Sequence, residues 1–155
     1  MDRDAPITPS DVDELLVRMD EAAKAYVRGD HRRYFELFDH GDDYSLMPPN
    51  GGSTRHGFDL TDEDIAEGGT FFESGEAWLD VEQTYVSGDL VVLVAVERQH
   101  GVVGDLPDQD LSLRITMVFR RDGARWRVVH RHADGLVREI PFDLFARLAR
   151  GDVEG

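Results

Sequence analysis

The sequence lacks cysteine altogether and contains a single lysine, Lys24. The absence of cysteine excludes a disulfide framework, a thiolate nucleophile and zinc or iron–sulfur sites with cysteine ligands. A chain without disulfides is typical of the reducing cell interior, so we expect a cytoplasmic protein. Lys24 is expected on the polar side of a helix, which argues against Schiff-base chemistry.

Positive charge is also scarce. The 155 residues include 17 Lys and Arg against 32 Asp and Glu, which gives a formal net charge of −15. Such an acidic surface repels phosphate backbones and anionic lipids. No run of residues approaches the roughly 18 apolar positions of a membrane-spanning helix, and the N-terminus lacks the basic and apolar segments of a signal peptide. The sequence therefore predicts a protein that binds neither nucleic acid nor a membrane.

The common catalytic motifs are missing as well. The sequence contains no GxSxG, GxGxxG, Walker or HExxH motif, which excludes the usual serine-hydrolase, dinucleotide, nucleoside-triphosphatase and zincin sites. No cofactor is expected. His130 and His132 lie two apart on a predicted strand and could bind a metal with a third ligand. Since no ligand spacing is recognisable and both are expected on the outer face with Trp126 and Val128, no metal site is predicted.

Two helices are predicted near the N-terminus, each beginning at a capping residue. Thr8 and Asp11 form a capping box, and apolar residues at three- and four-residue spacing continue this helix to about Arg28. Asp30 can cap a second, shorter helix that Gly41 closes.

Two more helices and a short strand follow from the same signals. Residues 44–47 form a strand candidate that ends in a Pro- and Gly-rich turn. Thr61 begins a third helix that carries Phe72 among its apolar residues, and Pro141 begins a last helix that Gly151 ends.

From residue 77 onward the apolar period changes from 3.6 to 2, which indicates strands. Gly88 and Gly123 occupy tight hairpin turns, so the strands should form an antiparallel meander. The four strand candidates are residues 77–87, 90–100, 111–121 and 125–133.

The strand over residues 90–96 is apolar on both faces. Antiparallel sheets with one solvated face alternate between apolar and polar residues, so both sides of this sheet should be covered. Helices can cover one side, and a second copy of the sheet is the simplest cover for the other. We therefore expect a homodimer through the sheet; the alternative is that terminal segments cover this face.

The end of the chain carries a family resemblance. RRDG at 120–123, followed by WRVVHRH at 126–132, resembles the last hairpin of SnoaL-like proteins in the nuclear transport factor 2 superfamily and of the calcium/calmodulin-dependent protein kinase association domain. The order of elements extends the resemblance over about residues 9–135 of a single domain, 1–155. It implies an α+β, cystatin-like cone in which three N-terminal helices pack on a curved antiparallel sheet. The helix at 141–150 is an addition.

The superfamily places a pocket between the concave face of the sheet and the helices. Its members include isomerases, dehydratases, cyclases, hydrolases and proteins that only associate, so the fold alone does not give the function. Ketosteroid isomerase uses an aspartate base with a tyrosine and a protonated aspartate. Tyr34, Tyr44 or Tyr85 could supply a phenol here, and Asp80 or Glu82 a carboxylate, but no spacing selects a pair. Whether the chain is an enzyme stays open.

Three arginines are candidate ligand-binding residues. Arg98 matches an arginine that lines the pocket of the kinase association domain and is the principal candidate, with Arg114 and Arg131 after it. If the strand register brings them together in a partly dry cavity, an anion such as a carboxylate would compensate their desolvation. The alternative is that each arginine pairs with an acid such as Glu82 or Glu97, or extends to solvent.

Phe38, Phe72 and Tyr44 complete the predicted pocket, since apolar and aromatic side chains line most ligand sites. The ordinary alternative for these aromatic residues is the core. The sequence thus predicts a small-molecule pocket for an acidic, partly apolar metabolite, with isomerisation, addition or elimination as candidate reactions. The alternative function is a non-catalytic association module whose dimer is the function.

Overall fold

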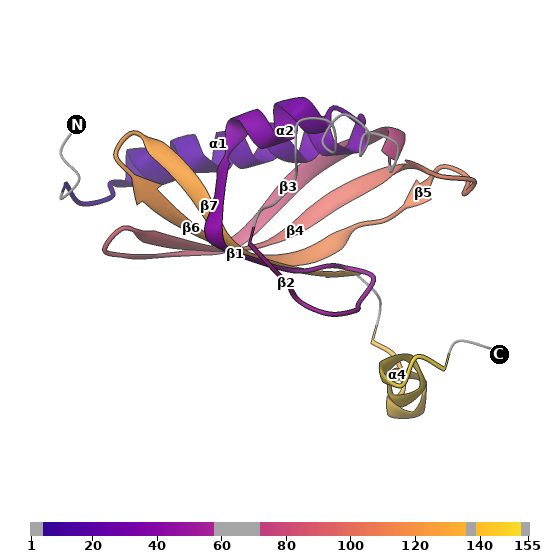
Figure 1. Ribbon diagram of the computed structural model, residues 1–155. Coiled ribbons are helices and arrows are strands. Elements are labelled where there is room, and N and C mark those ends of the chain that lie inside the picture. The colour runs from indigo at the N-terminus through magenta and orange to yellow at the C-terminus, as the bar shows by residue number, and fades with distance from the viewer. Residues whose placement is uncertain (1–4, 58–71, 136–138, 153–155) are drawn as a thin grey trace.

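The computed structural model describes residues 5–57, 72–135 and 139–152. In Figure 1, α1 (Pro9–Val27) and α2 (His31–Leu37) cover one face of a curved sheet, and α4 (Phe142–Ala149) lies beyond the opposite face. We call the face under α1 and α2 the inner face and the opposite one the outer face. Among the described residues, every helix is too short or too polar to cross a lipid bilayer.

The sheet has the strand order β2-β1-β7-β6-β4-β3, with β5 paired to β4 beside this path. The predicted meander is confirmed, because β3, β4, β6 and β7 pair antiparallel in turn. The expectation of a wholly antiparallel sheet is wrong at one place, since β1 pairs with β7 in parallel. These two strands lie far apart in sequence, as parallel pairing requires. The strands are β1 (Asp39–Met47), β2 (Arg55–His56), β3 (Phe72–Ser87), β4 (Leu90–Val103), β5 (Gln109–Asp110), β6 (Leu113–Asp122) and β7 (Arg125–Gly135).

The capping residues begin the N-terminal helices as predicted. The backbone N–H of Asp11 donates to Thr8 Oγ1 (3.2 Å), and Thr8 N–H donates to Asp11 Oδ2 (2.8 Å). Asp30 accepts from the N–H of the third residue of α2. The expected end of α2 at Gly41 is wrong: Phe38 is already extended, and the residues after it pair with β7.

Two further predictions have different outcomes. The helix expected from Thr61 lies outside the described residues, but Phe72 is the first residue of β3, so its assignment to that helix is wrong. The last helix is confirmed with Pro141 at its N-cap, and Gly151 follows it with a positive φ of 75°. Glycine adopts this conformation without steric cost, which allows the helix to end there.

The core lies between α1, α2 and the inner face. Alternate residues of β4, Val91, Leu93 and Ala95, are buried together with Leu15 and Met19 of α1. The core also contains Trp126, which packs with Val128 and is only 4% exposed, so its expected position on the outer face is wrong.

The outer face also carries apolar side chains. Val92 and Val94 alternate with the buried residues of β4 and lie opposite Val118 and Thr116 of β6. At the β3 edge, Trp78 and Tyr85 are 49% and 57% exposed. The strand read from the sequence as apolar on both faces therefore contributes apolar side chains to both faces of the sheet.

Candidate functional site

One ion pair interrupts the apolar inner face. Arg131 Nη2 donates to Glu97 Oε2 at 2.8 Å, and the two side chains are only 13% and 5% exposed. Glu97 follows Ala95 along the inward positions of β4, and Arg131 lies opposite Met117 of β6 on β7. The site is therefore carried by strands whose neighbouring inward residues form the core.

Burial makes this pair chemically distinctive. Burial alone would lower the pKa of Arg131, but the charge and hydrogen bond of Glu97, together with Tyr34 and Tyr44, more than offset this and raise it above its usual range. Arg131 Nη1 also donates to Met117 Sδ at 3.4 Å, and a thioether is a weak acceptor. A guanidinium carries five N–H donors. The contacts of Arg131 within the described residues therefore leave some of its N–H groups able to bind a ligand.

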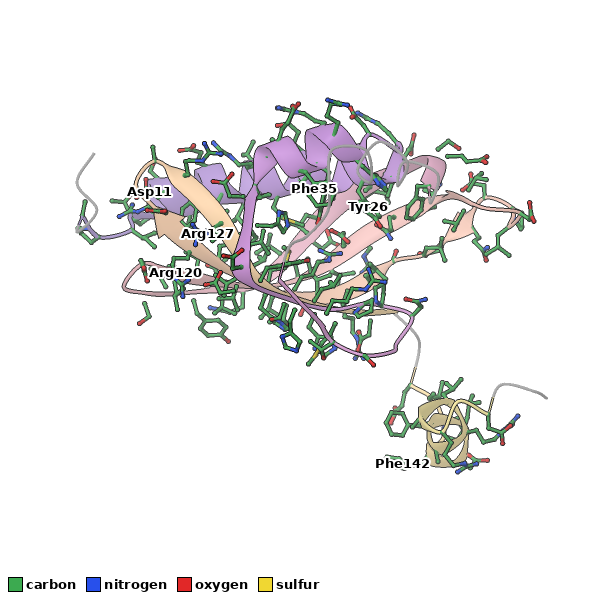
Figure 2. All side chains as sticks on the ribbon, viewed as in Figure 1. Asp11, Tyr26, Phe35, Arg120, Arg127 and Phe142 are labelled. Carbon is green, nitrogen blue, oxygen red and sulfur yellow. The ribbon has the colours of Figure 1, made fainter. Side chains whose placement is uncertain are left out.

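Aromatic side chains from three elements surround the ion pair. Tyr26 of α1 contacts Tyr34 of α2 with ring centroids 5.2 Å apart. His40 and Tyr44 of β1 lie edge-on at 4.8 Å, and His40 is 6.3 Å from Tyr34. Figure 2 shows Tyr26 on the helix side of the sheet. The charge of Arg131 acts on all four of these rings.

Desolvation controls the protonation of these rings. Burial raises the pKa of Tyr34 well above its usual range and raises that of Tyr26 and Tyr44 in the same direction, against the opposing charge of Arg131. Burial lowers the pKa of His40 to about 4. At neutral pH the site therefore contains protonated phenols, which can donate hydrogen bonds, and an uncharged imidazole.

This combination suits an anion with an apolar part. A guanidinium and neutral phenols can donate to a carboxylate or to an oxygen that gains negative charge, and Glu97 offers a proton acceptor beside them. Phe38 and Phe72, expected in the pocket, are buried instead. Phe38 packs on Phe119 at 5.2 Å and Phe72 on Tyr26 at 5.8 Å, so both belong to the packing behind the site.

Of the three predicted arginines, only Arg131 lies on the inner face. Arg98 and Arg114 lie on the outer face, where Arg98 Nε donates to Asp80 at 3.0 Å and Arg114 binds Asp134 through two hydrogen bonds of 2.9 Å. The expectation that Arg98 points into the cone is wrong. Val92, Val94 and Val96 share the face of Arg98 and are outer-face residues, because the odd-numbered residues of β4 face the helices.

The last strand also differs from its expected orientation. A register shift between Val118 and Phe119 places Val128 in the core and turns His130 and His132 to the outer face, so the three do not share a face as expected. His130 Nδ1 lies 2.7 Å from Ser45 Oγ. Over the described ranges, no group of three His, Cys, Asp or Glu side chains could hold a metal ion.

Several residues of the site were not singled out by the sequence. Tyr26 and His40 carried no motif, and Glu97 was considered only as a partner for an arginine. One feature of the sequence could have revealed Glu97: it occupies an inward-facing position of β4, where the other inward-facing residues are buried. A carboxylate at such a position needs a compensating partner.

Comparisons with known proteins agree with this architecture. A structure of a protein from Streptomyces avermitilis, described as a dehydratase of the nuclear transport factor 2-like family, is 22% identical, covers 84% of this chain and 100% of its own, and has a TM-score of 0.66. The CaMKII hub homology domain of Chlamydomonas reinhardtii is 16% identical over 81% of this chain and 98% of its own, with a TM-score of 0.62. These identities show the fold alone.

A third structure, a domain with a cystatin-like fold from Nostoc punctiforme, is 14% identical, covers 96% of this chain and 89% of its own, and has a TM-score of 0.60. A comparison with curated protein sequences gives no match. The sequence model of the SnoaL-like domain matches residues 16–134. Because this match spans more than half of the chain, the chain belongs to the SnoaL-like domain family.

Proposed function

We propose that the inner-face site binds a small, partly apolar carboxylate, with Arg131 as the principal anion contact and Tyr44 among its hydrogen-bond donors. The observation that carries this proposal is the Arg131–Glu97 pair, which is almost fully buried and whose arginine acts on the phenols of Tyr26, Tyr34 and Tyr44. A buried ion pair adds little stability compared with an apolar pair of similar volume, which supports a role in binding. The outer-face arginines Arg98 and Arg114 have no part in this site.

The same groups support proton transfer on the bound molecule. Glu97 would remove a proton from the carbon next to a carbonyl group, and Arg131 with a phenol would stabilise the resulting enolate oxygen. Return of the proton from Glu97 to another carbon of the same molecule completes an isomerisation without a co-reactant. Addition or elimination would begin with the same proton transfer. A neighbour described as a dehydratase fits this class of chemistry.

Binding is tested with phenylacetate as the probe and calorimetry as the measurement. The variant Arg131→Met/Glu97→Met removes the buried pair without leaving a lone charge, and Arg114→Met/Asp134→Met removes an exposed outer-face pair as its matched control. We expect the first variant to weaken binding roughly tenfold to a hundredfold, the range for a hydrogen bond to a charged group. The unaltered protein should also prefer phenylacetate to the uncharged phenylacetamide. The proposal would be overturned if both double variants bound phenylacetate equally well, or if the unaltered protein bound phenylacetate and phenylacetamide equally well.

Proton transfer is tested with phenylpyruvate, whose C3 protons are acidic. In D₂O, proton NMR should show C3 exchange that is faster with the unaltered protein than with Glu97→Gln or without protein. If C3 exchange proceeds at the protein-free rate while phenylacetate binds normally, the site binds carboxylates but does not catalyse proton transfer, and the catalytic part of the proposal is wrong.

A second candidate function is association. We propose that the apolar centre of the outer face, including Val92, Val94 and Val118, packs against a second copy of the sheet to form a homodimer. The similarity to a CaMKII hub homology domain supports this reading. For either function we place the protein in the cytoplasm, because the chain has no cysteine for structural disulfides.

A further inference from the structure

α4 carries an exposed apolar stripe. Phe142, Phe145 and Leu148 follow one another at three-residue spacing and are 88%, 57% and 52% exposed, and residues at this spacing share one side of a helix. Figure 2 shows Phe142 on α4, away from the rest of the protein. No residue of α4 is buried. The stripe therefore has no partner in a single chain within the described residues.

A helix of this length needs a surface on which to pack. α4 has 8 residues and no side-chain hydrogen bond at its N-cap. Isolated helices shorter than about 12 residues are marginal in water, and most helices in proteins depend on packing of an apolar side. The apolar stripe indicates which side of α4 packs.

The β3 edge of the outer face offers a partly apolar surface for this stripe. β3 is the last strand of the sheet order, and its outward Trp78 and Tyr85 are about half exposed. Asp80, which is paired with Arg98, and Gln83 lie between them on the same face, opposite Val96 and Val94 of β4. This edge, defined by Trp78, Gln83 and Tyr85, is accessible beside the valines at the centre of the outer face.

We propose that α4 is an exchanged arm, whose apolar stripe docks on the β3 edge of a second copy of this chain. The inference rests on the homodimer proposed above and adds a second contact to it. By two-fold symmetry, the second copy returns its own α4 to the β3 edge of the first.

The size of the contact fits a stable dimer. Aromatic side chains bury 150–250 Å² each, so the stripe offers roughly 400 Å² per helix. With the receiving surface and both symmetric copies included, the two arms would bury roughly 1,600 Å², which is the area of a standard specific interface.

The reach of the chain also fits. The chain from Gly135 to Phe142 can span at most about 25 Å, whereas packed sheets lie about 10 Å apart. Figure 1 shows α4 on the outer side of the sheet, where a second sheet would pack. A single chain already holds its own outer face close to α4 at high effective concentration, yet no α4 side chain is buried on it in the part of the chain that the structure describes. The second copy is therefore the favoured occupant.

Cross-linking tests the exchange directly, because the chain has no cysteine of its own. A chain with Ala149→Cys on α4 is mixed with a chain carrying Gln83→Cys on the β3 edge and treated with a short bismaleimide. We expect covalent dimers that contain one chain of each kind. The matched control pairs Ala149→Cys with Val17→Cys, an exposed residue of α1, and should give none. Cross-links formed within one chain by the double variant Gln83→Cys/Ala149→Cys would show docking on its own sheet and overturn the proposal.

The dimer dissociation constant, measured by sedimentation equilibrium, gives the second readout. Phe142→Ser/Phe145→Ser should raise this constant at least tenfold, whereas Asp143→Ser/Arg147→Ser, which alters polar residues of α4, should change it little. If the dissociation constant is unchanged and no cross-links form, the exchange of α4 is refuted, while the dimer through the sheet is not. An unaltered chain that sediments at 17.5 kDa overturns the homodimer as well. Flotation with phosphatidylcholine vesicles that depends on Phe142 and Phe145 would assign the stripe to a lipid surface and also overturn the arm.

Discussion

At the scale of single residues, the Arg131–Glu97 pair is the most informative feature of the inner face. Its charges are almost completely removed from water, and the desolvation of two ions can exceed their mutual attraction. The pair is tolerated because each ion compensates the other. Losing one partner should therefore cost much more than losing both.

Removal of the cation alone is predicted to be strongly destabilising. Arg131→Met leaves the Glu97 carboxylate buried without its partner, so the free energy of unfolding should fall by about 3–5 kcal/mol. Arg131→Met/Glu97→Met should recover most of this loss, because no lone charge remains. Urea denaturation of both variants measures the difference. Additive losses in the double variant would show that the pair is not energetically coupled.

The buried imidazole of His40 predicts a pH dependence of stability. Its pKa is lowered from 6.5 to about 4, so the unfolded chain binds a proton at a higher pH than the folded one. The stability that this difference provides is complete above pH 6.5 and decreases as the pH falls towards 4, by at most about 3 kcal/mol. Burial also lowers the pKa of His31, which adds to the loss in the same direction.

Urea denaturation between pH 7 and pH 4 checks this prediction. His40→Gln should lose much less stability over this range than the unaltered protein, because it has no imidazole to protonate there. His132→Gln, at an exposed position of the outer face, is the matched control and should behave like the unaltered protein. Equal pH profiles for all three proteins would show that protonation of the buried His40 does not cause the loss of stability at low pH.

At the scale of elements, the register of the strands decided which residues form the site. Both faces of β4 are apolar, so a shift of one residue decides whether Arg98 or Glu97 faces the helices. In β7 the register shift opposite Val118 and Phe119 separates the histidines from Val128. The residue pattern predicts the strands and their turns, since these depend on local chemistry. It could not predict the faces, because they depend on a bulge and on packing against α1.

The opposed glycines of β3 and β4 give an element-scale prediction. Gly75 and Gly101 are paired, and a Cβ at Gly101 would lie 2.5 Å from the Ser74 carbonyl oxygen and 3.0 Å from the Phe72 ring. Gly101→Ala must therefore shift the backbone and is expected to lower the free energy of unfolding by about 1–3 kcal/mol, as overpacking does.

Chemical denaturation with Gly41→Ala as the control measures this effect. A Cβ at Gly41 would meet side-chain atoms of Arg127 and Asp43 at 3.2 Å, and these ends can move. The control should lose clearly less stability than Gly101→Ala. A similar loss in both variants would indicate that the general cost of replacing glycine, rather than the close approach of the strands, determines the result.

At the scale of the whole molecule, the order of the N-terminal helices and the final hairpin predicted the cystatin-like architecture. The parallel pairing of β1 with β7 was not predictable in the same way, because it joins segments from opposite ends of the chain. The molecule also combines a net charge of −15 with an apolar outer face. In the proposed homodimer, two copies would attract through this face and repel through their charge, and salt would screen only the repulsion.

The unaltered protein is predicted to have twice the 17.5 kDa chain mass at micromolar concentration, and its dimer should tighten as ionic strength rises from 0.05 to 0.3 M. Val94→Glu places a charge at the centre of the outer face and should give a monomer, because an unpaired charge buried between the sheets is costly. Val17→Glu is the matched control on α1, where the side chain is exposed and the dimer should persist. Light scattering at each salt concentration measures these masses, and a monomer for the unaltered chain throughout would refute the dimer.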